Sequence, residues 1–531
     1  MAATLSAQRQ TGSFYTEQSI AKYMVDWAIR SPCDHILEPS FGDGVFIEAS
    51  AQRIRKLGNK SPNITAVELK EDTFRRFGNK GIDITAYHDD YLGVTLHDNV
   101  DVVIGNPPYV SLKHLPEDQK RNALNILSNH DIAAPLNGSL WLPFVLHSVD
   151  SLNDGGRLAF VLPFEITYVK YAFEMWNFLA ERFGQLTVVR LYEDFFPDVD
   201  VETILLLAED KGKQTASVEY IIYESIYNMC LNIAMSTNTV KIVDITQNKK
   251  PFISSLITNA QKSNANIIFF SDEILTPLVD VCKFKIGYVS ADKAFFHPNE
   301  STVKKYNLSS NSLVPCIQNG KQINGGTGIG VFVDEGLCAS KLYLPLSPND
   351  QDKEYIKHGE ELGVSKKYKC SHRNPWYITP TVEIPDVILT VFGDLPKLVI
   401  NSGGYAVSNS LLCGTLKGIT AKELVARWYN SLTLLSIELS AHSLGGGSFV
   451  IIPGEADQLK IVRPLPEANV DDISSSINKC ICDRSISEAY KLGDELVLQN
   501  ILGLTQLQIF QIRSAIETLR KWRLPHNRRH K

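Results

Sequence analysis

Hydrophobic residues in the first half of the chain alternate between short apolar runs and longer stretches with helical periodicity. Apolar runs of strand length occur in residues 35–46, 63–72, 81–92, 100–109, 155–165, 185–193 and 201–210. Helical periodicity is found in residues 19–30, 140–153 and 171–184. Strands that alternate with helices of about 10–15 residues predict βαβ units and a mostly parallel, seven-stranded α/β sheet covered on both faces. The last two runs follow each other closely, which predicts an antiparallel pair at one edge.

The pattern changes after about residue 245. The predicted segments become shorter, and turn-rich stretches separate them at residues 297–312, 318–330 and 344–354. Helical periodicity returns in residues 486–522. The sequence therefore predicts two domains, 1–245 and 246–531, of which the second has a mixed α/β fold with long loops and C-terminal helices.

Composition and charge narrow the class of protein. The chain has 531 residues, 44% of them apolar and 21% charged, which is typical of a globular protein. It has no apolar run of about 18 residues and no N-terminal apolar segment, so we expect no membrane span and no secretory signal. The nine cysteines are scattered along the sequence, which predicts reduced thiols in a cytoplasmic protein and no metal site.

Charge is distributed unevenly between the two halves. Residues 1–247 carry 21 Lys and Arg against 32 Asp and Glu, a balance of −11. The remaining residues have a balance of +5, and the last twelve include six basic residues and no acid. A solvated basic end is the simpler interpretation of the tail alone, but a basic half joined to an acidic half indicates a polyanionic partner.

Acidic and glycine residues stand at the ends of the first three predicted strands. The segment Glu38–Gly44 follows the first strand, Glu68 ends the second, and Asp89 and Asp90 follow the third. Ligands of open parallel sheets bind at the carboxyl ends of the strands, where an acid commonly binds the hydroxyls of a ribose. The dinucleotide and phosphate-loop signatures are missing, so the predicted ligand is a nucleoside without a long phosphate tail.

The fourth strand ends in the rigid turn Asn106-Pro107-Pro108-Tyr109. An amino group on a nucleobase is a weak nucleophile, because its lone pair is delocalised into the ring. The Asn106 side-chain oxygen and the Pro107 carbonyl can accept hydrogen bonds from such a group, and the prolines hold both acceptors in place. The Tyr109 ring can stack on the flat face of the base. The turn predicts catalysis by orientation and electrostatics, without a covalent nucleophile.

The order of these motifs resembles that of the gamma-class, TaqI-like DNA adenine-N6 methyltransferases. The segments that carry the resemblance are TGSFYT (11–16), LEPSFGDGVF (37–46), AVELKED (66–72), HDDYL (88–92), NPPYV (106–110), GSLWLPFVL (138–146), GGRLAFVLP (155–163) and FFPDVDVETILLL (195–207). The resemblance is close from residue 11 to about 210 and looser in 284–296 and 445–466. It implies a Rossmann-like class I methyltransferase domain followed by a DNA target-recognition domain.

The resemblance also implies roles for individual residues. Thr16, Glu38, Pro39, Phe41, Gly42 and Gly44 would bind the methionine end of S-adenosylmethionine, and Glu68 and Leu69 its ribose. Asp90 or its neighbour Asp89, with Tyr91 and Phe144, would bind the donor adenine. The target base would be bound by Asn106, Pro107, Pro108 and Tyr109, and Phe196 would contact the edge of the base. Asn106 would also lie near the donor. Glu38 and Phe41 replace the Asp and Cys that often stand at these places in the family.

For some of these residues, a structural role without a function in binding or catalysis stays open. Phe196 and Phe195 could be core residues of an edge strand, and Phe144 on an apolar helix could serve packing alone. His88 is better explained as a loop residue than as a general base.

Several functions are compatible with the catalytic turn read alone. The expected reaction is methyl transfer from S-adenosylmethionine to N6 of an adenine flipped out of double-stranded DNA, which leaves S-adenosylhomocysteine. The alternatives are methylation of an RNA adenine or of a protein glutamine, an inactive binding module, and cytosine-N4 methylation, for which Ser usually replaces Asn106. Glu68-Leu69-Lys70 has the form of a nuclease motif, but it lies in a strand, so we expect no nuclease activity.

The resemblance leaves the biological setting of the enzyme open between two cases. The chain would be either the modification enzyme of a restriction–modification system, with a separately encoded endonuclease, or a solitary methylase. We expect a monomer that needs no metal.

Overall fold

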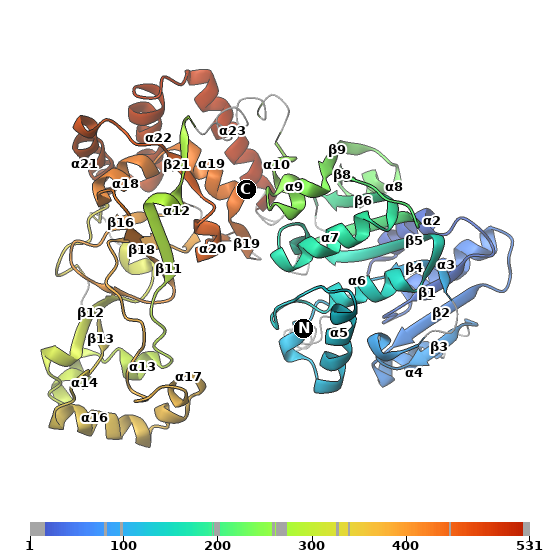
Figure 1. Cartoon of the computed structure of the whole chain (residues 1–531), viewed down its shortest axis with the longest axis horizontal. Coiled ribbons are helices and arrows are strands. Elements are labelled where there is room, and N and C mark those ends of the chain that lie inside the picture. Colours follow the sequence, from blue (N-terminus) through green and yellow to red (C-terminus); the bar gives the residue numbers. More distant parts are fainter. Residues whose placement is uncertain are drawn as a thin grey trace. The chain divides into compact units, whose positions relative to one another are not determined.

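A computed structural model of the chain describes residues 16–78, 82–95, 99–193, 195, 202–257, 261, 273–324, 329–337, 340–393, 395–444 and 448–523. The described residues form two compact units, which fall within Met1–Ser255 and Leu256–Leu524 (Figure 1). They are called the first and the second unit below, and each is described by itself. The functional domains 1–245 and 246–531 stay a prediction.

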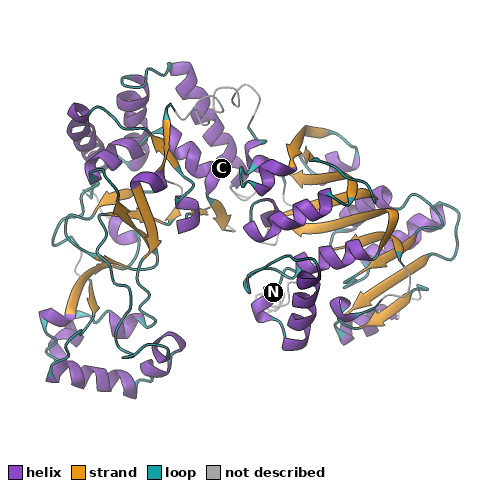
Figure 2. Cartoon of the chain, in the orientation of Figure 1, coloured by secondary structure: helices purple, strands orange, loops and turns teal. Residues whose placement is uncertain are grey.

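The first unit is built around one large sheet, in which helices cover both faces (Figures 1 and 2). In the described chain it has nine strands in the order β3-β2-β1-β4-β5-β7-β6-β8-β9. The strands are β1 (His35–Glu38), β2 (Asn63–Glu68), β3 (Thr85–His88), β4 (Val100–Gly105), β5 (Leu152–Pro163), β6 (Phe183–Leu191), β7 (Thr203–Lys211), β8 (Ser217–Tyr223) and β9 (Ala234–Lys241).

The helices of the first unit connect these strands. Its α-helices are α2 (Gln18–Ala28), α3 (Val45–Lys56), α4 (Glu71–Gly78), α5 (Glu117–Asn129), α6 (Trp141–Asp150), α7 (Phe173–Ala180), α8 (Ile226–Cys230), α9 (Ile242–Thr246) and α10 (Pro251–Ser254). Short 3₁₀ turns are η1 (Tyr91–Gly93), η2 (Leu112–His114), η3 (Phe164–Thr167) and η4 (Lys170–Ala172). The apolar faces of α2 and α3 pack on the sheet in one buried cluster, which includes Met24, Phe46, Ile104 and Val161.

The seven predicted strands are all present as β1 to β7, and the structure adds β8 and β9. Strands β1 to β5 are parallel, because helical crossovers connect them. Strands β6 and β7 form the expected antiparallel pair, but β7 lies between β5 and β6. The expectation that this pair forms an edge was wrong, because β8 pairs with β6 and β9 pairs with β8.

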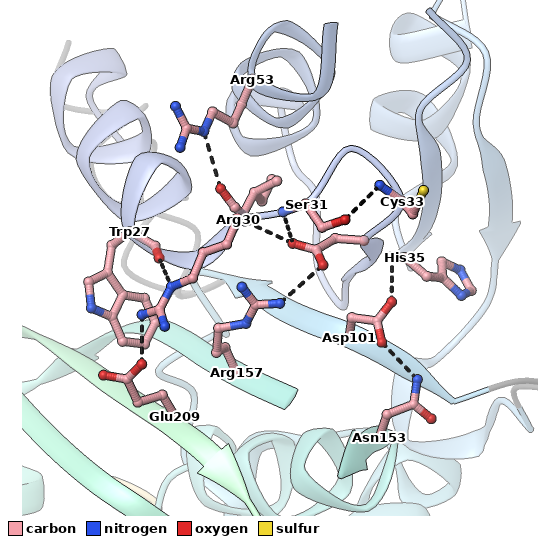
Figure 3. A network of polar contacts seen from close by, with 12 residues as sticks. Trp27, Arg30, Ser31, Cys33, His35, Arg53, Asp101, Asn153, Arg157 and Glu209 are labelled. Carbon is pink, nitrogen blue, oxygen red and sulfur yellow. Dashed lines mark hydrogen bonds and ion pairs between the residues drawn. The ribbon is translucent and has the colours of Figure 1, made fainter. Parts of the chain in front are cut away.

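A polar network fixes the amino ends of the central strands (Figure 3). The buried Asp34 carboxylate precedes β1 and accepts from the Arg157 guanidinium of β5 at 3.1 Å. Asp101, at the start of β4, accepts from the backbone N–H of His35 at 2.9 Å and from the Asn153 amide at 3.0 Å. These bonds connect β1, β4 and β5 at the edge opposite to their carboxyl ends.

The second unit contains several small sheets and a helical C-terminal part. Its sheets have the orders β10-β21, β11-β18-β14-β16, β13-β12-β17 and β15-β20-β19 in the described residues. Their strands are β10 (Leu275–Pro277), β11 (Cys282–Ile286), β12 (Leu313–Ile317), β13 (Lys341–Tyr343), β14 (Val387–Thr390), β15 (Phe392–Gly393), β16 (Leu398–Ile400), β17 (Ala406–Val407), β18 (Leu411–Leu416), β19 (His442–Leu444), β20 (Ser448–Val450) and β21 (Lys460–Val462).

The helices of the second unit are mostly short until the C-terminal part. They are α12 (Leu278–Val281), α13 (Lys293–Phe296), α14 (Glu300–Lys305), α15 (Lys321–Asn324), α16 (Asp350–Glu361), α17 (Tyr368–Ser371), α18 (Ala421–Trp428), α19 (Ser431–Ser440), α20 (Pro453–Ala456), α21 (Glu467–Asp483), α22 (Ile486–Gly493), the π-helical turn η7 (Asp494–Gln499) and α23 (Gln506–Arg523). Arg520 and Arg523 of α23 both bind the buried Glu438 carboxylate, which fastens α23 to α19. Among the described helices, none is long and apolar enough to cross a membrane.

Candidate active site

The segment after β1 forms a tight loop at the carboxyl edge of the sheet. Gly42 and Gly44 both have a positive φ, of 51° and 80°, and Gly44 is the N-cap of α3. A Cβ atom at position 44 would overlap the Phe77 ring, so only glycine fits. The Phe41 ring is buried against Phe74 and Phe77, with ring centroids 6.1 and 5.0 Å away. The loop is thereby held close to the strand ends.

A cavity of about 370 Å³ lies beside this loop. Its lining brings together five of the predicted site residues, which are Thr16, Glu38, Phe41, Gly42 and Asn106. Ser40 and Asp43 also line the cavity and lie within the predicted segment Glu38–Gly44, whereas the sequence did not point to Gln18, Val45, Phe46, Glu48 and Ala49. Val45 and Ala49 are one helical turn apart on α3, so the helical period after the loop was the signal that could have found this face.

Two carboxylates stand next to each other at the ends of β1 and β2. Glu38 is 1% exposed, and its Oε2 atom has no hydrogen-bond partner among the described residues. Burial and the charge of Glu68 raise the pKa of Glu38 well above its usual range. Glu68 accepts from the backbone N–H groups of Gly42 at 2.9 Å and Lys70 at 2.8 Å. A cation in the cavity would relieve the desolvation and the repulsion that this pair imposes on Glu38.

The residues predicted to hold the donor adenine lie around the end of β3. The Asp90 carboxylate accepts from the Leu92 backbone N–H at 3.3 Å and from the Asn122 amide at 2.9 Å. Tyr91 is buried, and its hydroxyl lies 3.1 Å from the Ser148 hydroxyl. Burial raises the pKa of Tyr91 to about 12. The Phe144 ring on α6 lies 5.1 Å from the Tyr91 ring, so both aromatic side chains form part of the packing at this edge.

The other predicted donor residues differ in exposure. Leu69 and Asp89 are exposed, and Leu69 is 47% exposed directly after β2. Pro39 is buried, and its ring would be 3.4 Å from a Cβ atom at position 105. The end of β4 and the first loop therefore lie close together. Phe196 lies outside the described residues, whereas its neighbour Phe195 belongs to the buried core.

The Asn106 amide at the end of β4 is held from both sides. Its Nδ2 atom donates to the Thr16 hydroxyl at 3.3 Å, and its Oδ1 atom accepts from the Tyr109 hydroxyl at 2.8 Å. The same Tyr109 hydroxyl lies 2.9 Å from the Val161 carbonyl of β5. Burial, followed by the negative charge of Glu165, raises the pKa of Tyr109 well above its usual range. The amide oxygen that the sequence assigned to the target base is therefore occupied by a hydroxyl of the same turn.

The two prolines complete the turn. Pro107 is buried and Pro108 is half-buried. No described residue donates a hydrogen bond to the Pro107 carbonyl. Beyond the turn, the Val110 carbonyl accepts from the Leu140 backbone N–H at 2.8 Å, which fixes the following loop against the start of α6. Within the described part of the chain, the turn thus combines a carbonyl acceptor that receives no hydrogen bond with an amide acceptor that receives one from the Tyr109 hydroxyl.

Family models match both halves of the chain. Residues 2–277 match the family "N-6 DNA Methylase", and residues 249–498 match the C-terminal domain of the type II methyltransferase M.Eco57I. The first match covers more than half of the chain. It spans β1 to β9, the cavity and the catalytic turn.

Curated relatives and a solved structure are similar over most of the chain. The type II methyltransferase M.AccI of Acinetobacter calcoaceticus is 25% identical over 408 residues, which cover 73% of this chain and 72% of that protein. M.PaeR7I of Pseudomonas aeruginosa, another type II methyltransferase, is 27% identical over 93% of this chain and 94% of its own length. The type IIL restriction-modification enzyme MmeI, solved in complex with DNA, has the same fold with a TM-score of 0.56 at 12% identity. That similarity covers 95% of this chain and 75% of MmeI.

The sheet, the carboxyl-edge loops and these similarities define the class of protein. The first unit has the class I methyltransferase fold, which uses S-adenosylmethionine, and a further domain follows it. The chain belongs to the N-6 DNA methylase family and is a DNA methyltransferase. This confirms the predicted fold class and family, and the order of its motifs agrees with the gamma class. The alternatives of an RNA or protein substrate are not favoured.

Proposed function

We propose that the enzyme transfers the methyl group of S-adenosylmethionine to N6 of an adenine that is flipped out of double-stranded DNA. The observation that carries this proposal is the catalytic turn beside the cavity. Asn106 both lines the cavity and presents an amide oxygen, next to the Pro107 carbonyl, to which no residue in the described part of the chain donates. Two acceptors at one place match the two hydrogens of an exocyclic amino group.

The cavity chemistry supports a cationic donor. S-adenosylmethionine carries a sulfonium and an ammonium group, and the buried Glu38 carboxylate has an oxygen to which no described residue donates. We assign Glu38, Phe41, Gly42 and Thr16 to the methionine end of the donor and Glu68 to its ribose hydroxyls. The donor adenine would lie near Leu69, Asp89, Asp90, Tyr91 and Phe144, with Pro39 and Gly44 shaping the loop. The donor supplies an electrophilic methyl group, and no metal is required for this assignment.

The target base is bound by the opposite side of the turn. The Tyr109 ring, positioned by its hydroxyl on β5, would stack on the adenine, and Phe196 would contact its edge. A base in a duplex must leave the stack to reach this edge of the sheet. We assign the second unit, within the predicted domain 246–531, to sequence recognition on duplex DNA, which a family match to a methyltransferase C-terminal domain supports.

The similarity to type II methyltransferases supports a role in restriction–modification. In this role a separately encoded endonuclease cuts DNA that the enzyme has not methylated, and the enzyme acts as a cytoplasmic monomer. Purified protein should therefore leave unmethylated plasmid intact in the presence of magnesium. Cleavage of the plasmid would contradict this part of the proposal.

The acceptor substrate can be tested directly. Purified protein is incubated with S-adenosylmethionine labelled in the methyl group and, in separate reactions, with duplex DNA, RNA or a release factor. We expect label on duplex DNA alone. Label on RNA or on the release factor, without label on DNA, would refute the proposed substrate.

A further inference from the structure

Glu165 lies at the carboxyl end of β5, where the sequence assigned no function. Strand β5 is parallel to β4 on one side and antiparallel to β7 on the other, so Glu165 is placed between the catalytic turn and the segment that leads into β7. Both neighbours are attached to this end of β5. The Tyr109 hydroxyl donates to Val161, and the Phe164 backbone N–H donates to the Glu202 carbonyl at 2.8 Å. Glu165 therefore belongs to the side of the site where the target base would bind.

The Glu165 carboxylate is held by neutral donors. Its Oε1 atom accepts from the Trp141 indole N–H at 3.0 Å and from the Tyr171 hydroxyl at 3.0 Å. The rings of Trp141 and Tyr171 are stacked, with centroids 5.7 Å apart and an angle of 30° between the planes. This arrangement fixes the carboxylate in one orientation without using its Oε2 atom.

The charge of Glu165 has no counter-ion among the described residues. No described Lys, Arg or His forms an ion pair with Glu165, whereas Arg190, which lies 4.1 Å above the adjacent Phe164 ring, is already paired with Glu202. The charge reaches the catalytic turn, because it contributes to the raised pKa of Tyr109. A fixed negative charge in a partly desolvated place interacts strongly with any charge that develops nearby.

We propose that Glu165 stabilises the positive charge that moves onto the target amine during methyl transfer. This inference rests on the proposed function. In the transfer, the N6 lone pair forms a bond to the methyl carbon, and the carbon–sulfur bond breaks with its electron pair left on sulfur. Sulfur becomes neutral while N6 becomes cationic, so positive charge moves from the donor cavity toward the end of β5. The N6 proton then leaves to water, which restores a neutral amine.

Glu165→Gln tests the charge while keeping an oxygen for Trp141 and Tyr171. We expect the single-turnover rate of methyl transfer to fall by about tenfold or more, with the donor and duplex dissociation constants within about twofold of the wild-type values. Glu165→Asp retains the charge and should have a rate well above that of Glu165→Gln. Glu174→Gln, an exposed carboxylate on the neighbouring helix α7, is the matched control and should behave as the wild type.

The outcomes separate this inference from the proposed function. Wild-type protein without any transfer to DNA would refute the proposed function itself. With an active wild type, a Glu165→Gln rate within about twofold of it would overturn the electrostatic role. Parallel loss of donor or duplex binding would also overturn it, because that result assigns Glu165 to the scaffold. A Glu165→Asp rate as low as that of Glu165→Gln would show that geometry, and not charge, is required.

Discussion

Substitution of Tyr109 by Phe separates the two roles that we propose for this tyrosine. The ring that would stack on the target base is retained, and only the hydroxyl is lost. This hydroxyl lies 2.8 Å from the Asn106 amide oxygen and 2.9 Å from the Val161 carbonyl. In the proposed reaction, the first of these oxygens accepts a hydrogen bond from the target amine. We therefore expect the hydroxyl to stabilise the folded protein and to compete with the substrate for the Asn106 oxygen.

The size of the expected effect on stability and on base binding follows from the loss of one hydrogen bond. The hydroxyl has a single proton, so the substitution removes about one net bond, and the free energy of unfolding should fall by about 1 kcal/mol. The same bond must be broken or redirected when the base enters. Its loss should strengthen binding of the flipped base by about twofold to fivefold, since 1.4 kcal/mol corresponds to about tenfold. Stability and base binding should change in opposite directions.

The assay uses a duplex that carries the recognition sequence, identified first by sequencing methylated DNA. A 2-aminopurine at the target position reports base flipping by fluorescence, and urea denaturation reports stability. Tyr227→Phe, at a tyrosine that is 72% exposed, is the control for both measurements. Tyr109→Phe with clearly weaker base binding would refute the competition, because the hydroxyl would then contribute to the bound state.

Three further predictions concern other parts of the site and the second unit. Asn106→Ala should abolish methyl transfer, while donor binding, measured by calorimetry, stays near normal. The control Asn125→Ala, at an exposed asparagine, should be without effect. Loss of donor binding in Asn106→Ala would contradict this prediction. Glu38 has a raised pKa, so the donor-free protein should lose stability relative to Glu38→Gln as the pH rises above 4.5. Added donor should reverse this loss. Parallel profiles of stability against pH for the two proteins would argue against the raised pKa. Buried Lys397 donates to the carbonyls of Ile323 and Ile329, and burial lowers its pKa from 10.5 to about 8. Wild-type stability should therefore rise between pH 8 and 10.5 relative to Lys397→Met, which denaturation at several pH values measures, and an equal slope would refute the shift.

The hydrophobic pattern predicted the strands that matter for the site. Strands β1, β2 and β4 to β7 are apolar runs that are mostly buried in the sheet, and such runs are visible in the sequence, whereas β3 is mostly exposed. Strand β9 was missed because it is an exposed edge strand, in which polar residues such as Asn238 and Thr239 replace the apolar run. The strands of the second unit have two to six residues, which is too short for a reliable period.

Local sequence motifs predicted the residues of the site, but the sequence did not predict which distant residues contact each other there. The glycine loop and the catalytic turn are read from adjacent residues, because each is one turn of chain. The bond from Asn106 to Thr16 connects residues 90 positions apart, and the sequence suggested both residues but not their contact. Glu165 meets Trp141 only because the sheet places β5 next to β4 and α6. The spacing of these residues in the sequence does not predict that contact.

The most direct test of the account is the chemical identity of the methylated product. Duplex DNA is incubated with the purified enzyme and labelled S-adenosylmethionine, digested to nucleosides and separated by chromatography. The account predicts label in N6-methyl-2′-deoxyadenosine. It predicts no label when the Asn106→Ala variant replaces the wild-type enzyme. Label in N4-methylcytosine, or equal labelling by Asn106→Ala, would contradict it.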